Sequence, residues 1–150
     1  MTHPIRNFLV TVLASGLAMM PTTTATAVEV TSLAGLEDIF GRYAPAGDCT
    51  RQPQVLVELK GLTFEVGGAT ETVTNPEYAA AYGPRDYTGI SKWIFPFRLA
   101  DGYSILMTFN ANEEKGVLHI DPQDEGWKGG PPLSPRNKAL VDGSPYARCQ

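Results

Sequence analysis

The sequence predicts a mainly β protein of the α+β class, with about six antiparallel strands in two meanders, a short helix at each end and one disulfide. The strands are expected to form a small barrel or sandwich. Residues 54–74 and 92–121 alternate apolar and polar side chains with the period of two that suits a strand burying one face. The chain has two cysteines, and its first 27 residues differ in composition from the rest. Together these observations indicate one exported β-rich domain over residues 28–150.

Residues 1–27 have the pattern of a secretory signal peptide. Arg6 supplies the positive start, residues 8–20 carry no charge, and Ala25-Thr26-Ala27 offers the small side chains that signal peptidase recognises. The alternative is an uncleaved membrane anchor. The apolar stretch is, however, shorter than the about 20 residues that a membrane-spanning helix needs. We therefore expect cleavage after Ala27 and a periplasmic or secreted protein that does not bind the membrane after cleavage.

The charge balance is mildly acidic. The whole chain has a formal net charge of −4, and loss of Arg6 with the signal peptide would change it to −5 because residues 1–27 contain no acid. Proteins that bind nucleic acid normally present a concentrated basic surface. We therefore expect no nucleic-acid partner.

Cys49 and Cys149 both follow the predicted cleavage site. In an oxidising compartment their default state is one intramolecular disulfide, although a reactive thiol pair or an intermolecular link would use the same residues. A redox pair usually has the spacing Cys-x-x-Cys, which brings the two thiols together locally. These cysteines are a whole domain apart, so the sequence favours a structural bridge between them.

The first predicted helix covers residues 31–40. Thr31 or Ser32 would cap it, and Pro45 and Gly47 would end it. Apolar side chains recur on one face at helical spacing, namely Leu33, Leu36, Ile39, Phe40 and Tyr43.

The first meander has expected strands at residues 54–60, 62–66 and 69–74, joined by tight turns at Lys60–Gly61 and Gly67–Gly68. Residues 75–90 follow as a long connection that carries three tyrosines.

The second meander has expected strands at residues 92–97, 103–109 and 117–121, with a hairpin turn at Asp101–Gly102. Pro96 suggests an edge strand or a bulge in the first of them. The second helix is predicted over Pro135–Asp142, because Ser134 suits the N-cap, proline suits the first helical position and Gly143 suits the C-cap.

No arrangement in the sequence identifies a catalytic or metal site. His119 is the only histidine after residue 27, and alternation in its strand places it on the face opposite Leu118 and Ile120, on the open side of the sheet. The nucleophile motif Gly-x-Ser-x-Gly is absent. The acids Asp121, Asp124 and Glu125 do not match a calcium-binding loop. We expect no catalytic residues, no metal and no cofactor, and whether the protein is an enzyme stays open.

Aromatic and proline residues in the predicted loops favour recognition instead, because such side chains give large contact areas at small entropic cost. The first hypothesis is an exported non-enzymatic binding protein of the cell envelope, an inhibitor or immunity-type partner of another envelope or secreted protein. Its candidate contact residues are Tyr82, Tyr87, Trp127 and Pro131. A structural role for the same side chains is the competing interpretation.

Two alternatives stay open. A small-ligand carrier would enclose an apolar cavity in the β scaffold, with candidate lining residues Trp93, Phe95, Tyr103, Ile105, Met107 and Phe109. A carboxylate-dependent hydrolase would need two acids and His119 in one cleft.

Overall fold

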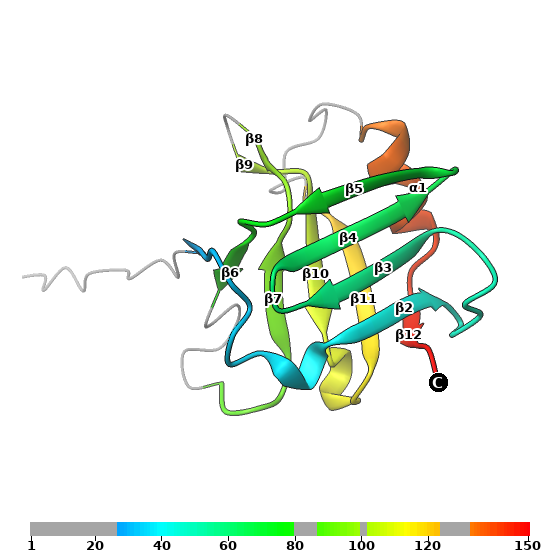
Figure 1. Ribbon diagram of the computed structural model, residues 1–150. Coiled ribbons are helices and arrows are strands. Elements are labelled where there is room, and N and C mark those ends of the chain that lie inside the picture. Colours follow the sequence, from blue (N-terminus) through cyan, green and yellow to red (C-terminus); the bar gives the residue numbers. More distant parts are fainter. Residues whose placement is uncertain (1–26, 80–86, 100–101, 124–132) are drawn as a thin grey trace, which may run out of the picture.

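The protein is a curled antiparallel sheet of ten strands, a half-barrel with one helix beside it (Figure 1). The computed structural model describes residues 27–79, 87–99, 102–123 and 133–150, so of the predicted signal peptide only Ala27 lies among the described residues. The strands of the sheet are β1 (Val28–Glu29), β2 (Gly41–Pro45), β3 (Gln54–Glu58), β4 (Gly61–Val66), β5 (Ala69–Val73), β6 (Glu77–Ala79), β7 (Lys92–Phe95), β10 (Ile105–Phe109), β11 (Val117–Pro122) and β12 (Tyr146–Arg148).

Five smaller elements complete the described part of the fold. The strands β8 (Arg98–Leu99) and β9 (Gly102–Tyr103) form a separate two-stranded hairpin. The helix α1 covers Pro135–Asp142, and single turns of 3-10 helix occur at Glu37–Ile39 and Ala111–Glu113.

The order of strands across the sheet is β1-β6-β7-β10-β11-β12-β2-β3-β4-β5. In Figure 1 the group β2 to β5 lies in front of the group β7, β10 and β11. The strand β12 joins the two groups: Leu118 of β11 is opposite Tyr146, and Ala147 is opposite Ala44 of β2. The concave side between the groups holds the main hydrophobic core.

That core follows from the alternation of side chains. Fifteen buried residues form one cluster, with Tyr43 and Phe109 meeting edge to face at a centroid distance of 5.5 Å. Inward side chains come from both groups of strands, and Leu33, Ile39 and Leu140 close the cluster from outside the sheet. Burial of apolar surface on this scale is the main favourable term in folding.

Most of the predicted central elements are confirmed. The meander β3–β4–β5 has the expected second turn, with Val66 opposite Ala69 across Gly67 and Gly68. Its first turn lies one residue earlier than predicted, at Leu59 and Lys60, because Glu58 is opposite Gly61. The strands β7, β10 and β11 pair as a second antiparallel group, and α1 has the predicted bounds with the Ser134 side chain accepting a hydrogen bond from the backbone N–H of Asn137.

The prediction of six strands and two helices is wrong. Residues 31–40 contain only one turn of 3-10 helix, because Gly35 has φ +86° and Phe40 is already extended with ψ 145°. The chain continues directly into β2, where Tyr43 belongs to a strand and not to a helical face. The helical spacing of apolar residues in this stretch therefore reflects burial of a loop and a strand against one core.

Apart from β2, the strands that the sequence pattern does not predict are short. β1, β6, β8, β9 and β12 have two or three residues each, which is too few to show a period. β6 lies inside the stretch that we expected to be a long connection. β7 ends at Phe95, just before Pro96, and pairs with both β6 and β10, so it is an inner strand and not an edge strand.

The predicted disulfide is confirmed. Cys49 and Cys149 are bonded with a Cα–Cα distance of 6.0 Å, and the backbone N–H of Cys149 donates to the carbonyl of Arg42 at 2.8 Å. The bridge therefore fastens the residue after β12 to the loop after β2. Among the described residues, no helix is long and apolar enough to cross a membrane.

We expect removal of this disulfide to lower the free energy of unfolding. The bonded cysteines are 100 residues apart, for which the chain-entropy model gives an upper value of about 4.7 kcal/mol, and loss of a native bridge from a small domain typically costs about 2–5 kcal/mol. Urea unfolding of the wild type and the C49S/C149S variant, followed by tryptophan fluorescence, measures the difference. Reduced wild type is the control and should match the variant, whereas equal midpoints for the variant and the oxidised wild type would contradict the expectation.

Candidate functional site

The outer face of the half-barrel carries a row of aromatic side chains, Tyr87, Trp93, Phe95 and Tyr103, called the aromatic row below. Tyr87 meets Trp93 edge to face at a centroid distance of 4.8 Å, and Phe95 stacks on Tyr103 at 4.2 Å. Ala79 and Leu106 complete the same cluster, and Ala27 packs against it. Such aromatic pairs stabilise a fold by about 0.5–1.5 kcal/mol beyond the contribution of the area that they bury. The contacts within the row therefore help to fix its side chains on this face.

A carboxylate accepts a tyrosine hydroxyl at each end of the aromatic row. Tyr87 donates to Glu113, and the same carboxylate accepts from the backbone N–H of Ile90 at 2.8 Å. The pKa of Glu113 is lowered from its usual value, and the hydrogen bond from Tyr87 is the largest cause. At the other end Tyr103 donates to Glu77.

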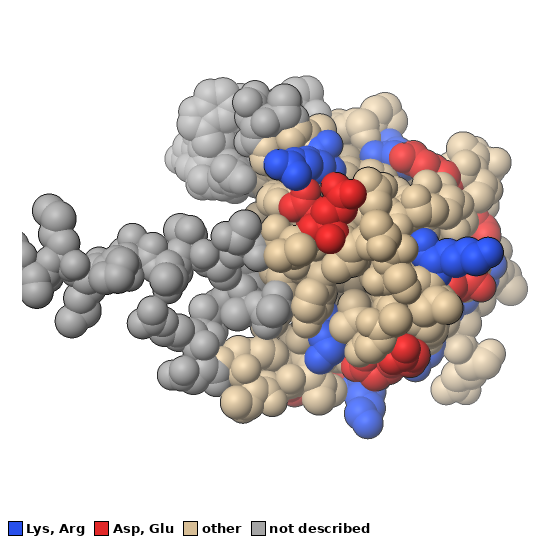
Figure 2. Space-filling view, turned by 60° about the vertical axis from the view of Figure 1, so that its left-hand side comes forward, with Lys and Arg blue, Asp and Glu red and all other residues tan. Residues whose placement is uncertain are grey.

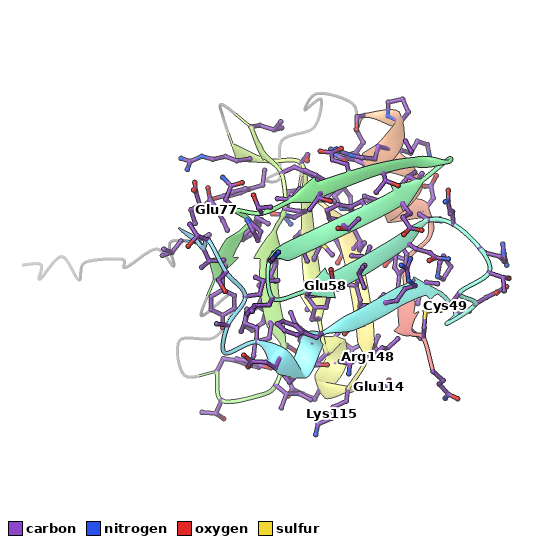
Figure 3. All side chains as sticks on the ribbon, in the orientation of Figure 1. Cys49, Glu58, Glu77, Glu114, Lys115 and Arg148 are labelled. Carbon is purple, nitrogen blue, oxygen red and sulfur yellow. A yellow bond between two sulfur atoms is a disulfide. The ribbon has the colours of Figure 1, made fainter. Side chains whose placement is uncertain are left out.

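Glu77 is 4% exposed, which is unusual for a carboxylate. Besides Tyr103 it accepts a hydrogen bond from Arg98 at 2.9 Å, whose side chain is 71% exposed. Figure 2, which brings the β6 side forward, shows acidic and basic side chains in small adjacent groups on this face. Figure 3 places Glu77 far from Arg148 and Cys49, which lie toward the opposite end of the sheet.

The structure divides the six candidate cavity residues between the two faces of the sheet. Ile105, Met107 and Phe109 point into the main core and are 0% exposed. Trp93, Phe95 and Tyr103 belong to the cluster on the outer face. Trp93 and Phe95 are on the outer face because Ile94 between them is opposite Met107 and shares its inward face. Tyr103 joins them because β9 ends at Tyr103 and β10 begins at Ile105 after a bend at Ser104, so the alternation does not run through the predicted strand 103–109.

Of the candidate contact residues, only Tyr87 lies among the described residues, and it is half-buried against Trp93. Tyr82, Trp127 and Pro131 lie outside them. One residue from the contact set and three from the cavity set thus meet in the aromatic row, a grouping that strand pairing reveals and the linear pattern does not.

His119 has the predicted orientation. Leu118 and Ile120 are buried in the core, and His119 is half-buried on the other face, opposite Thr108 of β10. Asp121 follows two positions later on the same face, whereas Asp124 and Glu125 lie outside the described residues. In the part of the chain that the structure describes, no group of three His, Cys, Asp or Glu could hold a metal ion.

A recess of about 450 Å³ opens between the β4–β5 hairpin and the start of α1. Its described lining residues are Phe64, Val66, Ala69, Glu71, Ser134, Pro135 and Arg136. They meet because the turn at Gly67 and Gly68, with φ +59° and +82°, folds β5 back on β4 and turns alternate side chains toward the helix. The sequence does not indicate this site, because its two sides are more than 60 residues apart along the chain.

Arg136 fixes one wall of the recess. Its guanidinium lies 3.6 Å from the centroid of the Phe97 ring, which in turn packs on Phe64 at 5.0 Å. It also pairs with Glu71 and donates to the side chain of Asn137 at 2.9 Å. Cation–π and ion-pair contacts together hold an otherwise flexible side chain in place. The recess therefore combines an apolar floor with one ion pair at its rim.

Comparison with models of known protein families, with curated protein sequences and with solved structures finds no match to this chain. The residues and their geometry are therefore the basis for the function proposed below.

We expect Glu113 to contribute to stability in a pH-dependent manner. Its pKa in the folded protein lies below the usual 4.5 because the Tyr87 hydroxyl and the Ile90 N–H stabilise its ionised form. The stabilising contribution is therefore fully present above about pH 4.5 and is lost as the pH falls through the lowered pKa.

Urea midpoints of the wild type and Glu113→Gln, compared from neutral to acid pH, measure this contribution. The wild type should be the more stable at neutral pH, and the gap should close on acidification. The matched control is Glu114→Gln, since the Glu114 side chain accepts no hydrogen bond from any described residue. A gap of constant size over the whole range would contradict the assignment.

Proposed function

We propose that this chain is an exported, non-enzymatic binding protein that recognises another protein of the cell envelope or the secreted fraction. The observation that supports it best is the recess between the β4–β5 hairpin and α1, which lies beside an exposed strand on a sheet fastened by a disulfide. A rigid scaffold loses little conformational entropy when a partner binds. Export is part of the proposal, and the signal-peptide pattern of residues 1–27 supports it.

The border of the aromatic row offers a second surface for the same role, because Trp93 and Phe95 within the row are buried. Tyr87 is half-buried and holds Glu113 at the border of the row. Tyrosine and tryptophan are enriched at the energetic centres of protein interfaces. Tyr87 therefore keeps its place, with Tyr82, Trp127 and Pro131, among the proposed contact residues.

The first test is affinity capture with the disulfide-bonded protein beginning at Val28, using envelope and secreted fractions of the source cells. We expect one stoichiometric partner. Alanine substitution of Tyr82, Tyr87, Trp127 and Pro131, one at a time, should weaken binding of that partner about tenfold or more at one position at least, as expected for a hot spot. The matched control is Tyr78→Phe, because Tyr78 packs toward the core on the opposite face. Unchanged affinity at all four positions would remove these residues from the interface.

A small-ligand carrier is the second candidate, and the recess favours it specifically. Ligand sites typically have volumes of about 300–1,000 Å³ and mostly apolar walls, and the recess of about 450 Å³ has Phe64, Val66, Ala69 and Pro135 in its lining. Its position differs from the cavity predicted from the sequence, since none of the six candidate cavity residues lines it. His119 does not line it either, so the recess gives the hydrolase alternative no support.

Native mass spectrometry of the purified protein tests the carrier. We expect a bound small molecule that is released on denaturation, and Ala69→Trp should abolish its retention because the indole would enter the recess. Thr70→Trp is the matched control, since the side chain of Thr70 points to the opposite face of β5. Protein without any bound molecule, or equal retention by both variants, would reject the carrier.

A further inference from the structure

The strand β5 forms one edge of the sheet and leaves part of its backbone unpaired. Val66 and Ala69 flank the two-residue turn, so they form a hydrogen-bonded pair, and the pairs alternate from there along the hairpin. Ala69, Glu71 and Val73 consequently turn their N–H and C=O groups toward β4. Thr70 and Thr72 turn theirs away from it, toward the open edge.

Neither of these threonines finds another backbone partner among the described residues. The first four residues of β5 are exposed. Natural proteins usually protect such an edge with lysine, proline, a bulge or a covering segment. β5 has neither lysine nor proline, and its single charged residue, Glu71, has its side chain on the recess side, where it pairs with Arg136. Within the described part of the chain, an accessible edge of four residues therefore remains, with the backbone groups of Thr70 and Thr72 turned outward.

The recess lies directly beside this edge. Ala69 and Glu71 contribute to it from β5, and Ser134, Pro135 and Arg136 face them from the start of α1. Figure 1 shows the end of the β4–β5 hairpin next to α1. A strand added to β5 would turn every second side chain toward the recess. Recognition by strand addition uses this combination, in which the backbone gives affinity and a pocket for alternate side chains gives specificity.

Charge indicates which side chains would fit. The chain as a whole is acidic, with a formal net charge of −4. At the rim of the recess the Glu71 side chain is 49% exposed despite its pairing with Arg136, so one side of its carboxylate faces solvent. A basic side chain on an added strand could share this carboxylate, while an apolar side chain two positions away would lie beside Ala69, Val66 and Phe64.

We infer that β5 binds an extended peptide segment of the partner protein as an additional antiparallel strand. The segment has the pattern basic-x-apolar, with the basic residue opposite Glu71 and the apolar residue opposite Ala69 in the recess. The order follows from antiparallel pairing, in which opposite residues share a face and the second strand runs in reverse. This inference rests on the proposed binding function and adds the site and the chemistry of the bound segment.

The test uses two synthetic pentapeptides with blocked ends and the same composition. The probe is Thr-Lys-Thr-Leu-Thr, in which lysine and leucine share one face of a strand. The control is Thr-Thr-Lys-Leu-Thr, in which they lie on opposite faces. Titration of each into the ¹⁵N-labelled, disulfide-bonded protein beginning at Val28 is followed by NMR. We expect saturable shifts and slower hydrogen exchange at the amides of Thr70 and Thr72 with the probe, and at least about tenfold weaker binding of the control.

Two variants separate strand addition from binding to the recess alone. Thr72→Pro removes an N–H that points to the open edge and leaves the pairing with β4 intact. This variant should therefore fold, and its affinity for the probe should fall by about tenfold or more. Thr72→Val retains the N–H and should bind as the wild type does. If Thr72→Pro does not fold, the probe with an N-methylated central threonine, titrated into the wild type, tests a second hydrogen bond of the same edge, because that threonine would donate to the Thr70 carbonyl.

Each remaining outcome overturns the inference. Equal binding of the two peptides, or no saturable shift at Thr70 and Thr72, would exclude recognition of the proposed segment at β5. Protection of these amides that rises with protein concentration in the absence of peptide would assign the edge to a second copy of the chain. If a captured partner binds the wild type and Thr72→Pro equally, the binding function stands and strand addition fails. If no partner is captured and the probe does not bind, both fail.

Discussion

The pairing of β12 with β11 on one side and β2 on the other is the constraint on which the rest of the structure depends. Three residues, Tyr146–Arg148, convert two groups of strands into one sheet. Side chains of the same segment hold it in place: Tyr146 is buried and donates from its hydroxyl to the carbonyl of Leu140 at 2.7 Å, and Arg148 donates to the Tyr43 hydroxyl at 3.0 Å. The Cys49–Cys149 bridge then fixes the adjacent position. The half-barrel is continuous because strand pairing, side-chain hydrogen bonds and the adjacent disulfide all hold this short segment in place.

The sequence predicts those parts of the fold that are determined by residues close together along the chain. Alternation reveals β3, β4, β10 and β11, and capping residues give the bounds of α1, because both signals need only a few consecutive residues. The short strands depend on partners far along the chain, and no local period marks them. The prediction of the first helix fails for a related reason: Gly35 and Gly41 have positive φ there, so the apolar residues of that stretch reach the core without a helix.

The sequence predicts which types of residue the candidate site contains, but not which residues come together there. Tyr87 and Trp93 are conspicuous in the sequence, yet only the pairing of β7 with β6 and β10 decides the face of Trp93, and Tyr87 meets Trp93 from the segment before β7. The bend at Ser104 moves Tyr103 to the same face while Ile105 enters the core. The recess has no sequence signal at all. It arises where α1 approaches an edge strand, and the Phe64–Phe97–Arg136 stack sets the separation of the two elements.

The position of β12 in the sheet also orders the assembly of the chain in time. A polypeptide is made from its amino end, so β3, β4 and β5 can pair as soon as they are complete, and β10 can pair with β11. The two groups, however, cannot become one sheet before residues 146–149 have been made, because these residues form the junction. A chain that stops short of Tyr146 would leave β11 and β2 each with an unpaired inner edge, which marks it as prone to aggregation. The two groups of strands therefore become one sheet only after this segment has been made.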